Sequence, residues 1–331
     1  MSTDGATGAT DLLTVRTVPP ALAGERVDRA ASVLFPDYSR TLLTRALTAG
    51  QLTVDGQVLR PRQRLKGGET LTLSGELRAE TLPDTPQAIP LSILYEDDDL
   101  LVLDKPAGLV VHPGAGNPDR TLVNALLAYR PALATLPRAG VVHRLDKETS
   151  GVMMVAASTA AHTRLVAMLA AREINRAYVA VVEGRLVSGA DYRQPIGRDP
   201  HHRTRQAVRE DGRAAHTSVR VLERFRVHTS VQATLHTGRT HQIRVHLGHA
   251  GYPLVGDAKY GARGRLPPAP SSELIRTIRG FRRQALHAEH LALDHPRTGE
   301  PLQFTAPRPL DIELLLQRLR EDVRASESDD V

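Results

Sequence analysis

A short polar segment enclosed by apolar residues is the feature that most constrains this chain. Residues 140–156 read GVVHRLDKETSGVMMVA, in which two apolar runs flank a core with seven polar residues. Apolar runs of this length, bounded by glycine, are typical of buried strands, so the pattern predicts a polar loop held between two strands. Loops on a rigid scaffold often carry catalytic groups. Asp146 is the first candidate, because Arg144 and Lys147 place cations close to it in the chain.

Composition limits the chemistry that such a loop can perform. The chain has 331 residues and no cysteine, which excludes disulfides, thiol nucleophiles and cysteine-ligated metals. A formal net charge of +6 with 3% aromatic residues predicts a polyanionic partner, bound through phosphates and shape. A basic protein without such a partner is the alternative that charge alone leaves open. With no signal-peptide pattern and no apolar run of about 18 residues, we expect a cytoplasmic protein.

The distribution of apolar residues, prolines and charges divides the chain into segments. Strands outnumber helices in the larger part and are often joined by short turns, so we expect an α+β fold with a mixed, largely antiparallel sheet. We expect a disordered N-terminus over 1–13, a small domain over 14–75, a linker over 76–90, a large domain over 91–320 and an acidic tail over 321–331.

Local patterns predict the elements of the small domain. Helical spacing indicates a helix over 27–34 and a second helix that Ser39 caps and Gly50 ends. The pair Asp55-Gly56 predicts a hairpin. Beyond the hairpin, cations occur at every second residue and would share one face of an extended segment, although a solvated strand face is the alternative. These cations are Arg60, Arg62, Arg64 and Lys66.

In the large domain, capping residues mark the expected helices. Thr121 and Thr240 are each expected to cap a helix, and further helices are expected over 160–171 and 310–323. Lys105, at the end of a predicted strand, lies either near the site or on the surface.

The chain shows no pattern for a cofactor. His241, His246 and His249 fall in one predicted helix, but His241 and His246 lie on different faces, which leaves two ligands. No Walker, dinucleotide or GxSxG pattern occurs. We therefore expect no metal and no cofactor, and nucleophilic or acid–base chemistry by a carboxylate. A structural ion pair or a turn position is the alternative for Asp146, and spacing alone does not decide between the two.

Several motifs resemble one known family. HRLDKETSG at 143–151, TGRTHQIRVHL at 237–247 and GYPLVGDAKYG at 251–261 are similar to motifs of the RluA class of pseudouridine synthases. The similarity extends from Gly24 to about Pro309. The order VDRA, YSR, AGQLTVDGQVL and LKGGETLTL resembles the small RNA-binding domain first described in ribosomal protein S-four. The resemblance implies a pseudouridine synthase catalytic domain preceded by a small α/β RNA-binding domain.

The resemblance also implies roles for individual residues. Asp146 acts on the target uridine, and Tyr178 lies against the base. Arg244 pairs with the aspartate, Arg144 enters the RNA stack in place of the flipped nucleotide, and Ile243 belongs to the apolar wall. In the small domain, the residues implied to face RNA are Arg40, Arg45, Arg60, Arg62, Arg64 and Lys66.

The implied function is the isomerisation of uridine to pseudouridine in a stem-loop of large-subunit (23S) ribosomal RNA. The partner is then this RNA or a pre-ribosomal particle, with no membrane, and a monomer is favoured. Two alternatives stay open. One is a related synthase that acts on tRNA or another ribosomal site, and the other is a non-catalytic RNA-binding protein that assists ribosome assembly.

Overall fold

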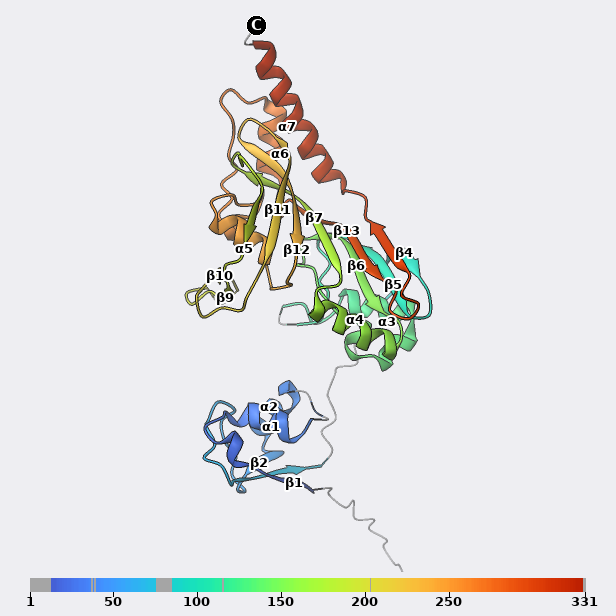
Figure 1. The fold of residues 1–331 in the computed structure, drawn as a ribbon, viewed down its shortest axis with the longest axis vertical. Coiled ribbons are helices and arrows are strands. Elements are labelled where there is room, and N and C mark those ends of the chain that lie inside the picture. Colours follow the sequence, from blue (N-terminus) through green and yellow to red (C-terminus); the bar gives the residue numbers. More distant parts are fainter. Residues whose placement is uncertain are drawn as a thin grey trace, which may run out of the picture. The chain divides into compact units, whose positions relative to one another are not determined.

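A computed structural model describes residues 13–36, 38, 40–75, 85–114, 116–202 and 204–329 (Figure 1). The chain forms two compact units that divide between Pro83 and Asp84. Each unit has its own hydrophobic core. No helix of the described residues has the length and apolar character needed to cross a membrane.

The smaller unit packs two helices against a three-stranded antiparallel sheet in the order β1-β3-β2. The first helix buries Val27, Ala30 and Ala31, and the second buries Leu43 and Leu47. Gly50, with φ +79°, ends the second helix as predicted. The elements are β1 (Leu13–Thr17), η1 (Pro20–Leu22), α1 (Val27–Leu34), α2 (Arg40–Ala49), β2 (Leu52–Val54) and β3 (Thr70–Ser74).

Three predictions for this unit differ from the structure or fall outside the described residues. The predicted hairpin turn at Asp55-Gly56 is present and is closed by an antiparallel bridge between Val54 and Gln57, but residues 58–60 form no strand and β2 pairs with β3 instead. The basic row is not one extended strand, since a turn at residues 61–62 interrupts it, although all four of its cations are exposed. The predicted cap Ser39 lies outside the described residues.

The larger unit is built on a nine-stranded sheet in the order β4-β5-β6-β13-β7-β12-β11-β8, with β14 also paired to β13. Within the described sheet β6 and β13 run parallel, and the other neighbouring strands run antiparallel, which confirms the predicted class. The strands are β4 (Ser92–Glu96), β5 (Leu100–Lys105), β6 (Ser150–Ala156), β7 (Asn175–Glu183), β8 (Ala190–Tyr192), β11 (Thr217–Arg224), β12 (His228–Leu235), β13 (Leu286–Asp294) and β14 (Pro301–Thr305), with a separate pair β9 (Ile196–Arg198) and β10 (Gln206–Val208).

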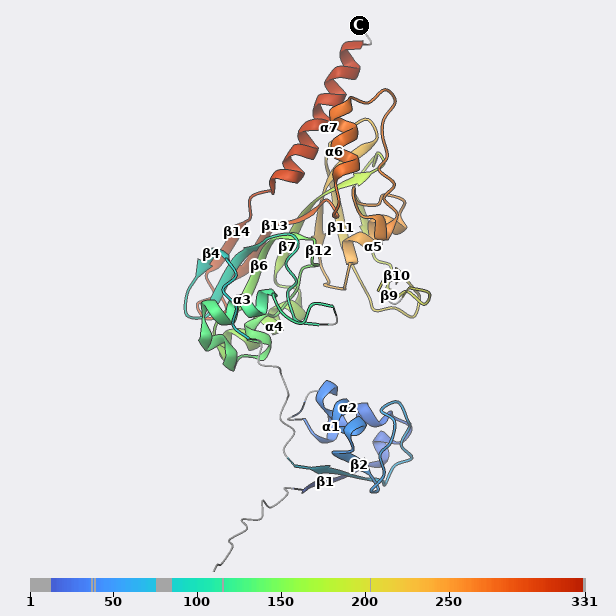
Figure 2. The same cartoon turned by 180° about the vertical axis from the view of Figure 1, so that it is seen from behind.

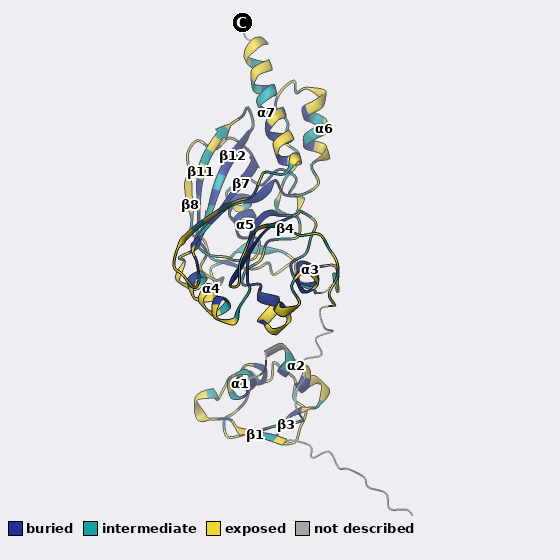
Figure 3. Ribbon diagram, turned by 90° about the vertical axis from the view of Figure 1, so that its right-hand side faces the viewer, coloured by how far each residue is buried: buried dark blue, intermediate teal, exposed yellow. Residues whose placement is uncertain are grey.

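Strand β7 lies between two cores, which explains its nearly continuous burial (Figure 3). Successive side chains of a strand point to opposite faces. Tyr178 and Ala180 therefore join the core that includes β5 and β6, whereas Val179 and Val181 join the core beneath α6 and α7. The helices are α3 (Leu122–Tyr129), η2 (Pro131–Thr135), η3 (Pro137–Gly140), α4 (Thr159–Ala171), α5 (Gln242–His249), η4 (Ala258–Tyr260), α6 (Ser272–Gly280) and α7 (Leu310–Asp329).

Thr121 caps α3 as predicted, but two other helix ends differ. Thr240 is not the cap of α5: the helix begins at Gln242, whose side chain accepts hydrogen bonds from Thr237 and Arg239. Helix α7, which lies beside α6 in Figure 2, continues to Asp329. The expected acidic tail is thus helical over 321–329, where Asp322 pairs with Arg226 at 3.1 Å.

The segment around Asp146 is a loop with one flanking strand. Val141 forms only an isolated bridge with Val155, so the predicted first strand is wrong, whereas β6 is fully buried. Gly151 in β6 has φ +118°, and a Cβ there would lie 2.2 Å from the carbonyl oxygen of Ala288. Glycine is therefore required where β6 meets β13 beside the loop.

Replacing Gly151 with alanine should lower the free energy of unfolding by more than about 1 kcal/mol, because the new methyl group meets backbone at a positive φ. Gly280→Ala is the matched control, since a Cβ at Gly280 meets nothing within 4 Å. Urea denaturation of both variants measures the effect. Equal midpoints for the two variants would contradict this account of the β6–β13 contact.

Candidate active site

Asp146 lies on the wall of a cleft of about 620 Å³. The cleft is lined by the loop before β6, by β7 and by the turn that precedes α5. The side chain of Asp146 is 16% exposed, so it is largely withdrawn from solvent but can reach a bound molecule. Tyr178 and Arg144 line the same cleft. A concave site with convergent polar groups is the usual form of a small-molecule or base-binding pocket.

Arg244 connects Asp146 to a second carboxylate. Its Nη1 donates to Oδ2 of Asp146 at 3.0 Å, and its Nε and Nη2 donate to the two oxygens of Asp257 at 2.7 and 2.9 Å. The guanidinium also lies 4.9 Å from the ring centroid of Tyr260. Burial lowers the pKa of Arg244, but the hydrogen bonds and charges of Asp257 and Asp146 outweigh it, so the pKa is above its ordinary value. The structure thus brings Arg244 to Asp146 as a fixed cation.

The other oxygen of Asp146 faces His241. The Nε2 of His241 lies 3.8 Å from Oδ1 of Asp146, and the Nδ1 lies 2.6 Å from the hydroxyl of Tyr260. That hydroxyl also accepts from the amide of Gln206, so it connects His241 to the start of β10. Burial lowers the pKa of His241 to about 4. His241 is therefore neutral beside Asp146 at pH 7.

Tyr178 and Ile243 form an apolar part of the wall. Both are buried, and both line a smaller cavity of about 50 Å³ next to Arg244. Burial raises the pKa of Tyr178 to about 12. The phenol is therefore protonated at neutral pH and presents a ring and a hydroxyl to the cleft.

The remaining residues predicted to contact RNA are arginines and lysines of the cleft and of the smaller unit. Arg144 is exposed at the cleft and has no hydrogen bond or ion pair with any residue that the structure describes. In the smaller unit, Arg40 begins α2 and Arg45 is exposed on the same helix. Arg64, in the basic row, also donates to the carbonyl oxygen of Gly24.

Lys105 is fully buried, so its interpretation as a surface lysine is wrong. Its ammonium group donates to the carbonyl oxygens of Pro106, Leu109 and Lys147 at 2.7, 3.0 and 3.2 Å. Lys147 directly follows Asp146, so Lys105 ties the end of β5 to the loop that carries the carboxylate. Burial lowers the pKa of Lys105 to about 8.

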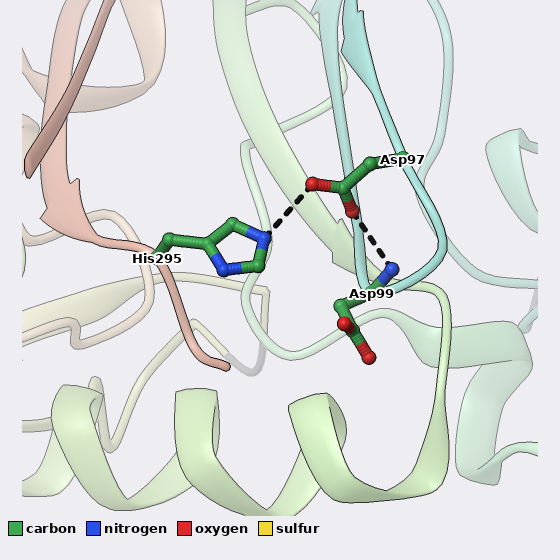
Figure 4. A group of neighbouring side chains, drawn as sticks. All are labelled: Asp97, Asp99 and His295. Atoms are coloured by element: carbon green, nitrogen blue, oxygen red, sulfur yellow. Dashed lines mark hydrogen bonds and ion pairs between the residues drawn. The ribbon is translucent and has the colours of Figure 1, made fainter. Parts of the chain in front are cut away.

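Another polar group lies where the turn between β4 and β5 meets the residue that follows β13 (Figure 4). Among the described residues, Asp97, Asp99 and His295 bring potential metal-ligand atoms within 4.8 Å of one another. These atoms already make other contacts: Asp97 accepts from His295 at 2.8 Å and from the amide of Asp99, and Asp99 pairs with Arg297. We interpret the group as a set of structural hydrogen bonds and ion pairs that connects two turns. Of the three histidines considered as metal ligands, His246 has both ring nitrogens in contact with other groups, the hydroxyl of Thr217 and the carbonyl oxygen of Gln194.

Sequence reasoning missed several members of the site. Asp257, Tyr260 and His241 contact Asp146 directly or through Arg244, and Arg176 lines the cleft. The motifs GYPLVGDAKYG and TGRTHQIRVHL contain the first three, so motif membership was the available signal.

Comparisons with known proteins agree with this geometry. Residues 99–249 match the profile of the family described as RNA pseudouridylate synthase. The chain is 54% identical to ribosomal large subunit pseudouridine synthase D of Xanthomonas campestris, with 94% of each chain covered. It is 52% identical to the protein of the same name from Pseudomonas aeruginosa, with 93% of this chain and 96% of that chain covered.

Two solved human structures are also similar. RNA pseudouridylate synthase domain containing 1 is 26% identical with a TM-score of 0.52, and covers 71% of this chain and 96% of its own. RNA pseudouridylate synthase domain containing 4 is 26% identical with a TM-score of 0.54, and covers 69% of this chain and 93% of its own.

Lys105→Met should make the chain less stable at neutral pH, since three carbonyl oxygens lose their donor. Between about pH 8 and pH 10.5 the unfolded chain holds the lysine proton that the folded chain has released. Stability therefore rises with pH in this window for the wild type and not for the variant. Urea denaturation from pH 7 to 10.5 should show a growing difference between the two proteins, and a constant difference would contradict the role of Lys105.

Proposed function

The chain belongs to the RluA class of RNA pseudouridylate synthases, and we propose that it converts uridine to pseudouridine in large-subunit ribosomal RNA. The enzyme class rests on family membership. The substrate rests on relatives that are 47–54% identical over at least 92% of the chain and are named for the ribosomal large subunit. These names favour large-subunit RNA over tRNA, and they favour an enzyme over a non-catalytic assembly factor.

The reaction explains why the site is a cleft. The bond from C1′ of the ribose to N1 of the base must break, the base must turn, and C5 must join C1′. The target nucleotide has to leave the RNA stack first, which is least costly in a loop or bulge. A cleft of about 620 Å³ has room for one extruded nucleotide beside Asp146.

The observation that carries the proposal is Asp146, held by Arg244 at 3.0 Å in the wall of this cleft. We assign Asp146 as the group that acts on the uridine, and Arg244 as the group that orients and electrostatically supports it. Tyr178 lies against the base as a protonated phenol, and Ile243 completes the apolar wall. The exposed Arg144 enters the RNA stack in place of the extruded nucleotide.

The smaller unit is assigned to docking of the RNA. Its basic row is exposed, as a phosphate-contacting surface must be. Arg40 and Arg45 on α2 are assigned to the same surface. The proposal includes a monomeric protein that works in the cytoplasm on free ribosomal RNA or a pre-ribosomal particle, without a metal or a cofactor.

Asp146→Asn should lower pseudouridine formation in a large-subunit RNA transcript by at least about 10³-fold, because the amide is neither anionic nor nucleophilic. RNA binding should persist. Asp294→Asn, at an exposed position on β13, is the matched control and should behave as wild type. Pseudouridine counted after a single turnover gives the rate. Full activity in the Asp146 variant would remove this residue from catalysis.

Reversing the charges of Arg60, Arg62, Arg64 and Lys66 together should weaken RNA binding and flatten its salt dependence by about 0.7–0.9 for each lost phosphate contact. The control reverses two exposed arginines of α6, Arg276 and Arg279. Affinities measured over a series of salt concentrations provide the slopes. If the slope of the basic-row variant stays at the wild-type value, this surface does not contact RNA.

A further inference from the structure

Arg176 lines the same cleft as Asp146, and the proposed chemistry gives it no role. It lies on β7, two residues before Tyr178, so both side chains point to one face of the sheet. Arg176 is only 8% exposed. The strand therefore places a buried cation beside the ring that faces the target base.

The guanidinium of Arg176 contacts no acceptor within the part of the chain that the structure describes. Among the described residues it forms no hydrogen bond and no ion pair, and its Nε is buried without an acceptor. Arg244 and Arg239, which also border the site, both donate to named acceptors. A buried donor without an acceptor is unfavourable, so an arginine in this position is retained where a ligand in the cleft supplies the acceptor.

Two neighbours of Arg176 leave its guanidinium open to a ligand. His143 accepts the amide hydrogen of Met154 on Nε2, and burial together with the charge of Arg176 lowers the pKa of His143 to about 3, so this neighbour is neutral and carries no negative charge for Arg176 to pair with. At Gly238, which also lines the cleft, a Cβ would lie 3.3 Å from Nη1 of Arg176. The missing side chain leaves this side of the guanidinium open to the cleft.

We propose that Arg176 donates hydrogen bonds to a carbonyl oxygen of the extruded uracil and stabilises the negative charge that the base gains when it detaches. This inference rests on the proposed function. A guanidinium has five donors and no acceptor, which matches O2 and O4 of uracil. If the contact is to O4, it also rejects cytosine, which carries an amino group at that position.

The charge follows from the bonds that change. When the bond from C1′ to N1 breaks, its electron pair stays on the base and is shared by N1, O2 and O4. The base then bonds to C1′ through C5, C5 loses its proton, and N1 gains one. A fixed cation at O2 or O4 is worth most while the base is anionic, which is the differential stabilisation that accelerates a reaction.

The burial of Arg176 favours the base over a phosphate as its ligand. Arg176 is buried next to Tyr178, whereas Arg138 and Arg144 line the same cleft and are exposed. A flipped base enters such a pocket, while its phosphates stay nearer to solvent.

The test uses the full chain as wild type, Arg176→Gln, Arg176→Lys and the control Arg164→Gln, which alters an exposed arginine of α4. Single-turnover rates, RNA affinities at several salt concentrations and thermal midpoints are measured with a large-subunit RNA transcript. Arg176→Gln should lower the rate by about 10²–10³-fold with unchanged affinity. Its midpoint should be equal or higher, because a cation with a buried donor that lacks an acceptor is removed. Arg176→Lys should recover part of the rate.

A second measurement identifies the contacted oxygen. RNA stem-loops that carry 2-thiouridine or 4-thiouridine at the target position replace one carbonyl oxygen with the weaker acceptor sulfur. One of the two should slow the wild type and have no additional effect on Arg176→Gln, because the interaction is already absent there.

Three results would overturn the inference. A weaker affinity and flatter salt slope at an intact rate would make Arg176 a phosphate contact. A lower midpoint with a matching loss of activity would make it structural, and wild-type behaviour throughout would leave it no ligand. If the wild type forms no pseudouridine at all, it is the proposed function that fails.

Discussion

The bridge from Asp146 through Arg244 to Asp257 is the interaction on which the rest of the site depends. Asp257 accepts hydrogen bonds from Nε and Nη2 of the guanidinium, which fixes the orientation of the group. The remaining Nη1 donates to Asp146. Asp146 and Arg244 lie 98 residues apart in the chain. The carboxylate keeps one oxygen bound to the arginine, and the other faces His241. The bridge gives Asp146 a defined orientation at the cleft.

The sheet supports this bridge from both sides. The Asp146 loop leads into β6, which pairs with β13 at a position that only glycine fits, and Lys105 at the end of β5 binds the carbonyl next to Asp146. Strand β7 is buried on both faces, so Tyr178 is held firmly. Rigid strands thus position the reactive groups, while Arg144 is exposed and makes no hydrogen bond or ion pair with the residues that the structure describes. This arrangement suits an enzyme whose reactive side chains must stay fixed while a nucleotide moves into the cleft.

Local patterns in the sequence predicted part of the local structure. Thr121 and Gly50 mark helix ends as expected, and the residues around Asp146 form the predicted loop before β6. Features that depend on distant partners were not predictable: burial of Lys105 follows from carbonyl groups up to 42 residues away, and the bond of Asp257 to Arg244 spans 13 residues. Thr240 is not a cap because the helix begins one residue later than predicted, with His241 at the N-cap position in the left-handed conformation (φ +57°). Helix propensity does not predict such a backbone conformation.

The central claim is that this chain makes pseudouridine in large-subunit ribosomal RNA. Chemical mapping of pseudouridine in the RNA of cells that lack the protein tests it most directly. The account predicts that specific pseudouridines disappear from large-subunit RNA, that they return when the chain is supplied again, and that tRNA is unchanged. Large-subunit RNA that keeps all of its pseudouridines, or losses confined to tRNA, would contradict the account.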